Sequence, residues 1–341
     1  MVTKIMRTVL LGCMIFCFFG CISTEDRQEK ATRLKPIASK HLFSVDAYGT
    51  NKVWAVGFEG MIHHSADGGK SWSIQKPPVC EDLYNVCFIS EQTGWIVGKH
   101  GVMLHTTDGG SVWRQLKTVT DCRLFDVYFV DNKMGWVVGT MGTILHTADG
   151  GETWTEQGWG EDRYYNGIYF IDKQKGWIVG EYSTMYVTDN GGKKWSPMSC
   201  KDIKPEEPPD DFPPPPPHLY GIYFQNADVG WITGMDGIII KTEDGGISWK
   251  LQTEKADFSL YQIAVQGGRG WAVGEKGSFM ISRDGGNTWQ MDKVALSTRF
   301  WLRDVVFADA QNGWIIGAGG TIIQTCDGGD TWIGLSGLFI R

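Results

Sequence analysis

The chain has 341 residues, of which 45 are Gly and 16 are Trp. The Gly residues lack the every-third-residue period of collagen, and 42% hydrophobic residues exclude a wholly disordered chain. Acidic residues outnumber basic ones by 39 to 32, a formal net charge of −7. This charge argues against nucleic-acid binding, which depends on neutralising phosphates.

Residues 1–20 have the layout of a signal peptide. Lys4 and Arg7 precede an apolar run from Val9 to Phe19, which is shorter than the about 20 residues needed to span a bilayer. The run ends in Phe18-Phe19-Gly20-Cys21, which is similar to a bacterial lipobox. We therefore predict that Cys21 is acylated after cleavage. A plain secretory signal cleaved nearby, and the rival motif Leu10-Leu11-Gly12-Cys13, remain alternatives.

Residues 21–40 are polar and are predicted to form a tether between the lipid and a folded domain. The expected location is the periplasmic face of a membrane. Ile22 is not the Asp that retains lipoproteins in the inner membrane, so a Gram-negative cell would sort the protein to its outer membrane.

Residues 41–341 repeat one unit seven times. The segment Ser65 to Trp72 recurs at intervals of 41, 41, 41, 54, 40 and 43 residues, measured at the closing Trp. A second Trp precedes the Asp position of each copy by 13 residues, so fourteen of the sixteen Trp belong to the repeat. A period of 40–45 residues with short strands is typical of propeller blades.

The second unit shows the strands that such a blade needs. They are expected at Leu83 to Ile89, Gly94 to Gly98, Val102 to Thr107 and Val112 to Lys117. Each run is short and bounded by Gly, Asp or Asn, and no segment has helical periodicity with caps. We predict an all-β fold: a single seven-bladed β-propeller with four strands per blade and about 41 residues per blade.

Each unit contains an Asp box in the turn between its third and fourth strands. The carboxylate is expected to accept backbone N–H bonds there, Gly supplies a positive φ, and Trp packs beneath. One acid per blade is too dispersed for one active site, so we interpret these residues as structural: Asp67, Asp108, Asp149, Asn190, Asp244, Asp284 and Asp327.

The inter-blade loops vary most in length and are expected to share one face with the turns between second and third strands. The longest is a Pro-rich insert at about 200–218, which includes the run Pro213 to Pro217. A Pro run favours an extended polyproline helix. A stiff exposed loop is one interpretation, and a docking arm or a lid is the other.

Two Trp lie outside the repeat, and each has Arg or aromatic neighbours. Trp159 precedes the fourth blade, Trp301 enters the seventh, and Arg123 enters the second. Aromatic and Arg side chains dominate interface hot spots. The alternative is packing between first strands. The candidate partner-binding residues are Arg123, Trp159, Arg163, Tyr164, Arg299, Trp301 and Arg303.

No metal, cofactor or disulfide is predicted. His64, His105 and His146 repeat at one blade position, but third strands of different blades cannot bring them to one ion, so we place them between blades. Five cysteines remain after the signal and Cys21, an odd number that defines no pairing.

Catalysis remains an alternative, because Asp boxes also occur in sialidases and other glycoside hydrolases. Four carboxylates lie in turns between second and third strands, namely Glu59, Glu181, Asp236 and Glu275. Two of them would pair as acid and base at about 5–10 Å. No nucleophile elbow, phosphate loop or metalloprotease motif accompanies them, so we predict no catalytic residue. A carbohydrate-binding propeller and a purely structural surface domain also stay open.

The unit from Gly135 to Trp154, GWVVGTMGTILHTADGGETW, resembles the photosystem II stability/assembly factor family of seven-bladed propellers. The resemblance covers about residues 41–341. It implies a non-catalytic assembly factor that binds newly made reaction-centre protein through a positively charged Arg patch, near which Arg123, Arg163 and Arg299 would lie. The expected partner is a protein, such as a membrane-complex subunit, bound by a monomeric propeller.

Overall fold

The computed structural model describes residues 40–203, 215–292 and 300–334. The chain divides into two units, Met1–Leu34 and Lys35–Arg341, and every described residue belongs to the second. The predicted signal peptide, Cys21 and all of the tether except Lys40 lie outside the described residues. Within the described ranges, no helix is long and apolar enough to cross a membrane.

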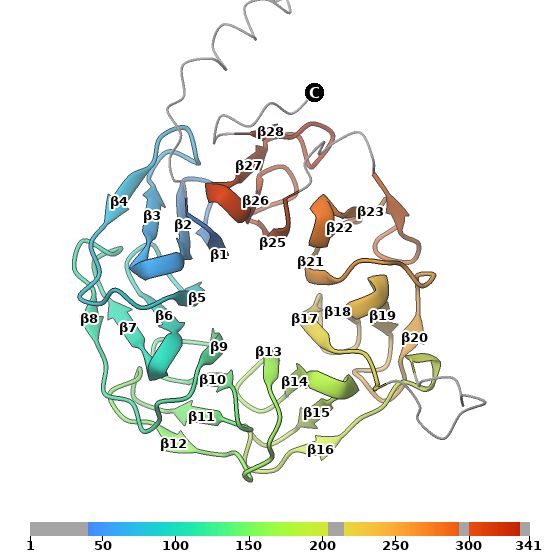
Figure 1. Ribbon diagram of the computed structural model, residues 1–341, viewed down its shortest axis with the longest axis horizontal. Helices are drawn as coiled ribbons and strands as arrows, with labels where there is room; N and C mark the ends of the chain where they lie inside the picture. The colour runs from blue at the N-terminus through green and yellow to red at the C-terminus, as the bar shows by residue number, and fades with distance from the viewer. Residues whose placement is uncertain (1–39, 204–214, 293–299, 335–341) are drawn as a thin grey trace, which may run out of the picture. The chain divides into compact units, whose positions relative to one another are not determined.

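Seven four-stranded antiparallel sheets form the blades of a ring in the second unit (Figure 1). The innermost strands are β1 (Leu42–Tyr48), β5 (Leu83–Phe88), β9 (Leu124–Phe129), β13 (Tyr165–Phe170), β17 (Leu219–Phe224), β21 (Leu260–Gln266) and β25 (Leu302–Phe307). The second strands are β2 (Lys52–Gly57), β6 (Gly94–Gly98), β10 (Gly135–Gly139), β14 (Gly176–Gly180), β18 (Gly230–Gly234), β22 (Arg269–Gly274) and β26 (Gly313–Gly317).

The outer half of each blade is shorter. The third strands are β3 (Ile62–Ser65), β7 (Met103–Thr106), β11 (Ile144–Thr147), β15 (Met185–Thr188), β19 (Ile239–Thr242), β23 (Phe279–Ser282) and β27 (Ile322–Thr325). The fourth strands are β4 (Ser73–Gln75), β8 (Arg114–Gln115), β12 (Thr155–Glu156), β16 (Ser196–Pro197), β20 (Lys250–Leu251), β24 (Gln290–Met291) and β28 (Ile333–Gly334).

Short 3₁₀ turns lie in the loops that connect the strands. Six of them join second to third strands: η1 (Phe58–Gly60), η2 (Lys99–Gly101), η3 (Glu181–Ser183), η5 (Met235–Gly237), η6 (Glu275–Gly277) and η7 (Ala318–Gly320). The remaining one, η4 (Lys201–Ile203), lies at the start of the Pro-rich insert.

This architecture confirms the predicted all-β, seven-bladed propeller. The expected strand bounds differ most at the fourth strand, which is β8 (Arg114–Gln115) rather than Val112 to Lys117. The fourth strand is the outer strand of its sheet, and its ladder with β7 contains only two residue pairs.

The apolar core lies between blades rather than within them. One buried cluster at each junction combines side chains from neighbouring sheets, seven in all among the described residues. At the junction of the first two blades, Trp54 stacks on Phe88 with ring centroids 3.5 Å apart, and Trp113 meets the same ring edge-on. The Gly before the repeat Trp of the second blade is required by this packing, because a Cβ on Gly94 would lie 2.6 Å from the Phe88 ring.

The ring closes through side chains, without exchange of a strand between the first and last blades. Every sheet contains four consecutive strands, so both end blades are complete. Asp304 of β25 accepts hydrogen bonds from the backbone N–H of Val45 (2.9 Å) and the hydroxyl of Ser44 (3.0 Å) in β1. Gln324 of β27 donates to the carbonyl of Gly68 in the first Asp box.

Candidate protein-binding face

The hydrogen bonds define two faces of the propeller. On one face, each Asp-box turn donates to the turn between first and second strands of its own blade, as Gly150 N–H does to the Lys133 carbonyl (2.9 Å). On the other, the residue after each second strand donates to the residue before the first strand, as Lys99 N–H does to the Asp82 carbonyl (2.9 Å). We call these the Asp-box face and the inter-blade face, and this pairing of loops confirms the expected arrangement.

Each Asp box makes hydrogen bonds within its own turn. Asp149 accepts the backbone N–H of Thr153 (2.9 Å) and the hydroxyls of Thr147 (2.8 Å) and Thr153 (2.6 Å). These bonds lower the pKa of the Asp149 carboxyl to about 2, and the bond from the Thr153 hydroxyl has the largest effect. Asn190 makes the same bonds to Thr188 and to the Lys194 N–H but has no hydroxyl partner at the fourth position, since Lys194 stands there.

The repeat Trp of the second strand joins one blade to the next Asp box. Five of these indole N–H groups donate to a box Gly of the following blade, as Trp95 does to the Gly150 carbonyl at 2.9 Å. The histidines follow the same logic. His105 stacks on Trp95 with centroids 4.9 Å apart, and His64 and His146 contact Trp54 and Trp136 in the same way. The histidines therefore lie at the blade junctions, as predicted.

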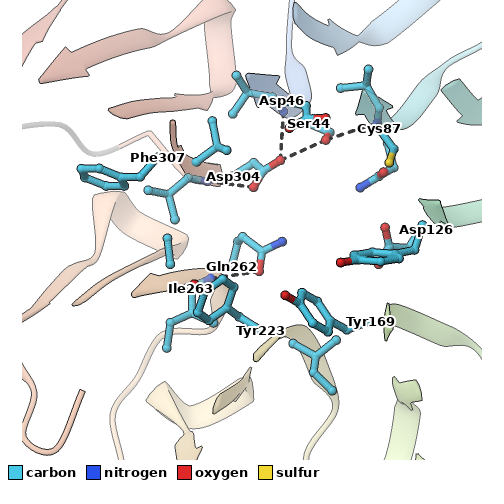
Figure 2. A pocket seen from close by; sticks show the side chains of 18 of the residues that line it. Ser44, Asp46, Cys87, Asp126, Tyr169, Tyr223, Gln262, Ile263, Asp304 and Phe307 are labelled. Carbon is cyan, nitrogen blue, oxygen red and sulfur yellow. Dashed lines mark hydrogen bonds between the residues drawn. The ribbon is translucent and has the colours of Figure 1, made fainter. Parts of the chain in front are cut away.

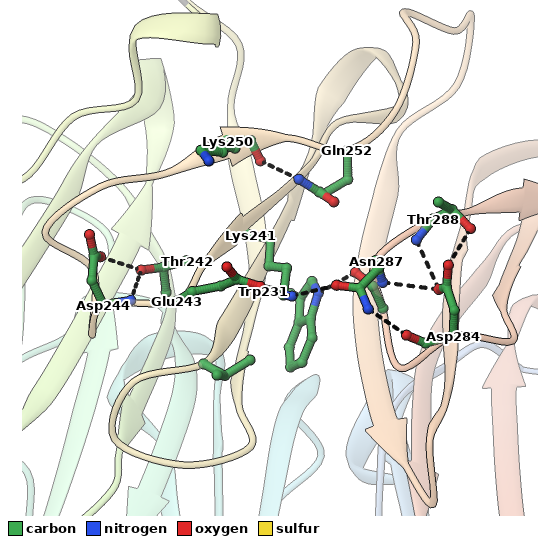
Figure 3. Close-up of polar contacts among 12 residues, drawn as sticks. Trp231, Lys241, Thr242, Glu243, Asp244, Lys250, Gln252, Asp284, Asn287 and Thr288 are labelled. Carbon is green, nitrogen blue, oxygen red and sulfur yellow. Dashed lines mark hydrogen bonds and ion pairs between the residues drawn. The ribbon is translucent and has the colours of Figure 1, made fainter.

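In the fifth blade Lys241 occupies this histidine position (Figure 3). Its ammonium group lies 5.7 Å from the centroid of Trp231, and it donates to Glu243 (2.5 Å) and to the side-chain oxygen of Asn287 (2.7 Å) in the next Asp box. A buried Lys is stable only when paired. Lys241 is therefore also part of a blade junction. Among the described residues, no group of His, Cys, Asp or Glu side chains could hold a metal ion.

The inter-blade face has a different character, because it carries a ring of aromatic residues at the channel mouth. Five of them occupy the second position of a first strand, where a β-bulge interrupts the pairing with the second strand. A bulge re-aims a side chain. We call this set the aromatic crown: Phe43, Tyr84, Phe125, Tyr220 and Tyr261, together with Trp301, which directly precedes the seventh blade.

The crown residues contact one another around the mouth. Trp301 stacks on Phe43 with an interplanar angle of 9°, and the chain of contacts continues through Tyr84 to Phe125, with centroids 5.7 to 6.1 Å apart. Tyr220 and Tyr261 form a second edge-to-face pair at 5.4 Å. In the seventh blade the crown position is Arg303, whose guanidinium lies 4.6 Å from the centroid of the Tyr261 ring.

The structure therefore brings two predicted residues, Trp301 and Arg303, into one site. A cavity of about 290 Å³ lies at the crown and is lined by Phe43, Tyr84, Phe125, Tyr261, Trp301 and Arg303. Tyr164, which is 38% exposed, extends the ring contacts beyond Phe125 at 6.1 Å. The other crown members escaped sequence reasoning because a bulge has no signature in these strands.

Trp159 and Arg163 belong to a separate cluster at the fourth blade. Trp159 is 45% exposed and packs edge-on against Tyr186 of the third strand, with centroids 4.8 Å apart. Tyr186 donates its hydroxyl to Glu161 (2.9 Å), and Arg163 lies 3.8 Å from the same carboxylate. Arg163 also covers the ring of Tyr182 at 5.7 Å. Glu161 thus holds the Trp159 loop onto the blade.

Arg123 enters the third blade, directly before β9, so its assignment to the second blade was wrong. The error came from counting the loop with the unit before it. The side chain is exposed, and its charge opposes the rise that burial causes in the pKa of Tyr84. The equivalent position holds Asp82, Tyr164, His218 and Ser259 in other blades, so the arginines form no repeated ring. Arg299 lies outside the described residues.

The Pro-rich insert is described only at its two ends. After it, the Pro217 carbonyl accepts hydrogen bonds from the backbone N–H (2.8 Å) and the hydroxyl (3.1 Å) of Ser183. His218 lies 4.0 Å from Glu181 in the same turn. These contacts fix the exit of the insert to the fourth blade; residues 204–214, which include Pro213, lie outside the described range.

The carboxylates considered for hydrolysis each have local partners. Glu275 accepts the Ser259 N–H (3.0 Å) and the Tyr261 hydroxyl (3.2 Å), and Glu181 accepts the Tyr164 N–H (3.2 Å). Glu59 pairs with Lys40, and Asp236 lies 3.3 Å from Lys255. These contacts hold the start of a first strand or the loop beside it.

Three acids, Asp46, Asp126 and Asp304, line the central channel, a feature that sequence reasoning missed (Figure 2). Asp46 accepts the N–H of Phe88 (2.6 Å), and Asp126 accepts that of Ile168 (2.8 Å), as Asp304 does at the ring closure. Each carboxylate thus joins the first strands of adjacent blades. Burial raises the pKa of Asp46 and Asp126 to about 7.

All five cysteines of the described part are free thiols.

Comparison with known proteins places this sequence in a family. The family model of photosynthesis system II assembly factor YCF48 matches residues 24–120, 108–210 and 214–301. A search of curated proteins gives no match. Among solved structures, YCF48 bound to D1 peptide is 20% identical with a TM-score of 0.70, covering 85% of this chain and 93% of that one.

Other solved structures share the fold. YCF48 from Cyanidioschyzon merolae is 20% identical with a TM-score of 0.70, covering 86% of this chain and 97% of that one. The GH74 xyloglucanase from Xanthomonas campestris is 11% identical with a TM-score of 0.68, covering 89% of this chain but 55% of its own. At these identities the structural likeness concerns the propeller alone. The family model spans most of the sequence, and the chain belongs to the photosynthesis system II assembly factor YCF48 family.

Proposed function

We propose that this protein is a non-catalytic, protein-binding propeller that aids the assembly or stability of a membrane protein complex. The observation that carries the proposal is the contrast of its faces: aromatic and Arg side chains gather on the inter-blade face, while the Asp-box face repeats one structural motif. Trp, Tyr and Arg are the side chains that dominate binding energy at protein interfaces.

Family membership supports a protein partner. A YCF48 structure with a similar fold was solved with a D1 peptide, so a relative binds a peptide segment. The partner of this chain is, on our proposal, a subunit of a membrane complex, such as a newly made photosystem II reaction-centre protein. The protein acts as a monomer and needs no cofactor.

The proposed location follows from the first forty residues. Export through the signal over 1–20 and acylation of Cys21 would hold the propeller at the periplasmic side of a membrane. Labelled palmitate incorporated by the wild type and lost in Cys21→Ser is the expected result. Unchanged incorporation in Cys21→Ser would refute that acylation site.

Co-purification from native membranes tests the function. The triple variant Arg123→Glu/Arg163→Glu/Arg299→Glu should lose the membrane partner that the wild type retains. The matched control reverses three exposed charges of the Asp-box face, Lys70→Glu/Lys133→Glu/Lys193→Glu, and should retain it. An identical partner set for both triple variants would refute binding through the inter-blade face.

A further inference from the structure

The aromatic crown borders an open cavity that no side chain of the described residues fills. Its lining is almost wholly aromatic, with one cation, and its volume of about 290 Å³ is at the lower end of the range for ligand pockets. The residues that line it are half-buried rather than covered. A concave apolar site of this size has room for one large side chain of a partner rather than for a drug-sized molecule.

Arg303 determines the polarity of this cavity. Within the described residues its guanidinium has no carboxylate within 4.0 Å, and its close contact is the face of Tyr261. Asp304 and Asp126 act on it from the channel below, at longer range. An Arg side chain has five N–H donors, and a half-buried guanidinium without an acceptor favours an anionic or carbonyl group in the ligand.

The charged residues around the cavity argue against recognition by charge alone. Arg163 is engaged by Glu161 and Tyr182, and Arg123 is exposed directly before β9. The aromatic contacts, in contrast, run without interruption from Trp301 to Tyr164. Most of the available binding energy on this face therefore lies in aromatic packing, with a single cation adding direction.

We propose that the crown cavity seats one large apolar or aromatic side chain of a partner segment, and that an adjacent acidic group of that segment binds Arg303. The inference rests on the proposed protein-binding function and names the chemistry of the partner. Phe43, Tyr84 and Phe125 form the apolar wall against which the side chain packs, and Arg303 on Tyr261 orients the segment across the mouth.

Blocked tetrapeptides test the site on the intact protein, with affinity measured by ligand-observed NMR. Acetyl-Gly-Asp-Phe-Gly-amide should bind, and replacing its Phe by Ala should weaken binding by about tenfold, as for a buried aromatic anchor. Replacing its Asp by Lys should weaken binding by a similar factor. Equal affinity of the Phe and Ala peptides overturns the proposal, as does binding of cellotetraose with no peptide bound. These comparisons need no variant protein.

Variants then locate the binding. Tyr84→Ala/Phe125→Ala and Arg303→Gln should each weaken the Asp-Phe peptide by about tenfold, while Ile247→Ala, an 87% exposed apolar residue in an Asp-box turn, leaves it unchanged. Unchanged affinity in both crown variants overturns the site. If the wild type still retains a membrane partner in that case, only the crown inference fails. A wild type that retains no membrane partner refutes the proposed function instead.

Discussion

The two faces of this propeller are built by the same seven units but differ in how strictly they repeat. On the Asp-box face, each box hydrogen-bonds its own turn in all seven blades. On the inter-blade face, the residue before the first strand changes from blade to blade, from Asp82 to Arg123 to Trp301. Repetition marks the side chains that hold the ring. Before the first strands the side chain differs from blade to blade, and only the backbone carbonyl takes part in the repeated bond.

The largest effect should come from a repeat Trp. Trp154 is 6% exposed and meets the Phe129 ring edge-on, so Trp154→Ala should lower the free energy of unfolding by about 3–5 kcal/mol. Trp159 lies outside the repeat and is half exposed, so Trp159→Ala should lower the free energy of unfolding by less than about 1 kcal/mol. Urea unfolding of both variants measures the difference. Equal losses would remove the distinction between the faces.

His63 is a break in the repeat that lies in neither face. It is fully buried in β3, where the second and third blades have Leu104 and Leu145, and neither ring nitrogen has a hydrogen-bond partner. Restoring the repeat residue with His63→Leu should raise the free energy of unfolding by about 1–3 kcal/mol, since a buried unsatisfied polar group is removed. Loss of stability would show that the side chain has a partner at the blade junction.

The same variant makes a prediction about pH. Burial lowers the pKa of His63 to about 4 from 6.5. Between these two values the imidazole is protonated in the unfolded chain and neutral in the folded protein. The contribution of His63 to stability is therefore constant above about pH 6.5 and falls as the pH drops towards 4. The difference between His63→Leu and wild type should widen over that window. Taking this difference in the free energy of unfolding cancels the contributions of the other histidines and of the channel acids. A difference that stays constant with pH would contradict the prediction.

The sequence predicted the repeated features well because each rests on local chemistry. Asp149 and Trp154 lie within one turn of each other, and their roles need no knowledge of the other blades. The crown was predicted only through Trp301 and Arg303, whose composition stood out. Phe43 and Tyr84 resemble ordinary strand residues, and only the bulge aims them at the mouth. Asp126 was missed because its partner, the N–H of Ile168, is on another blade.

A single Asp box should matter less than a Trp. Asp149→Ala removes three hydrogen bonds at an exposed turn and should lower the free energy of unfolding by about 1 kcal/mol. Asn190→Asp, in contrast, should change it by less than about 0.5 kcal/mol, because Lys194 offers no hydroxyl to the new oxygen. Because the pKa of Asp149 is depressed to about 2, its contribution should persist above about pH 4 and disappear as the pH falls towards 2.

The smallest effect on stability should come from the residues that we assign to binding. Arg123 is exposed, and the ion pair of Arg163 with Glu161 is 3.8 Å long and open to water, where such pairs contribute little. Arg123→Glu/Arg163→Glu should therefore keep the melting temperature while it loses the partner, the reverse of Asp149→Ala. A stability loss above about 1 kcal/mol would mean that Arg163 fastens the Trp159 loop to its blade. Arg163 would then serve both binding and folding. The side chains that vary on the inter-blade face would in that case include at least one that stabilises the propeller.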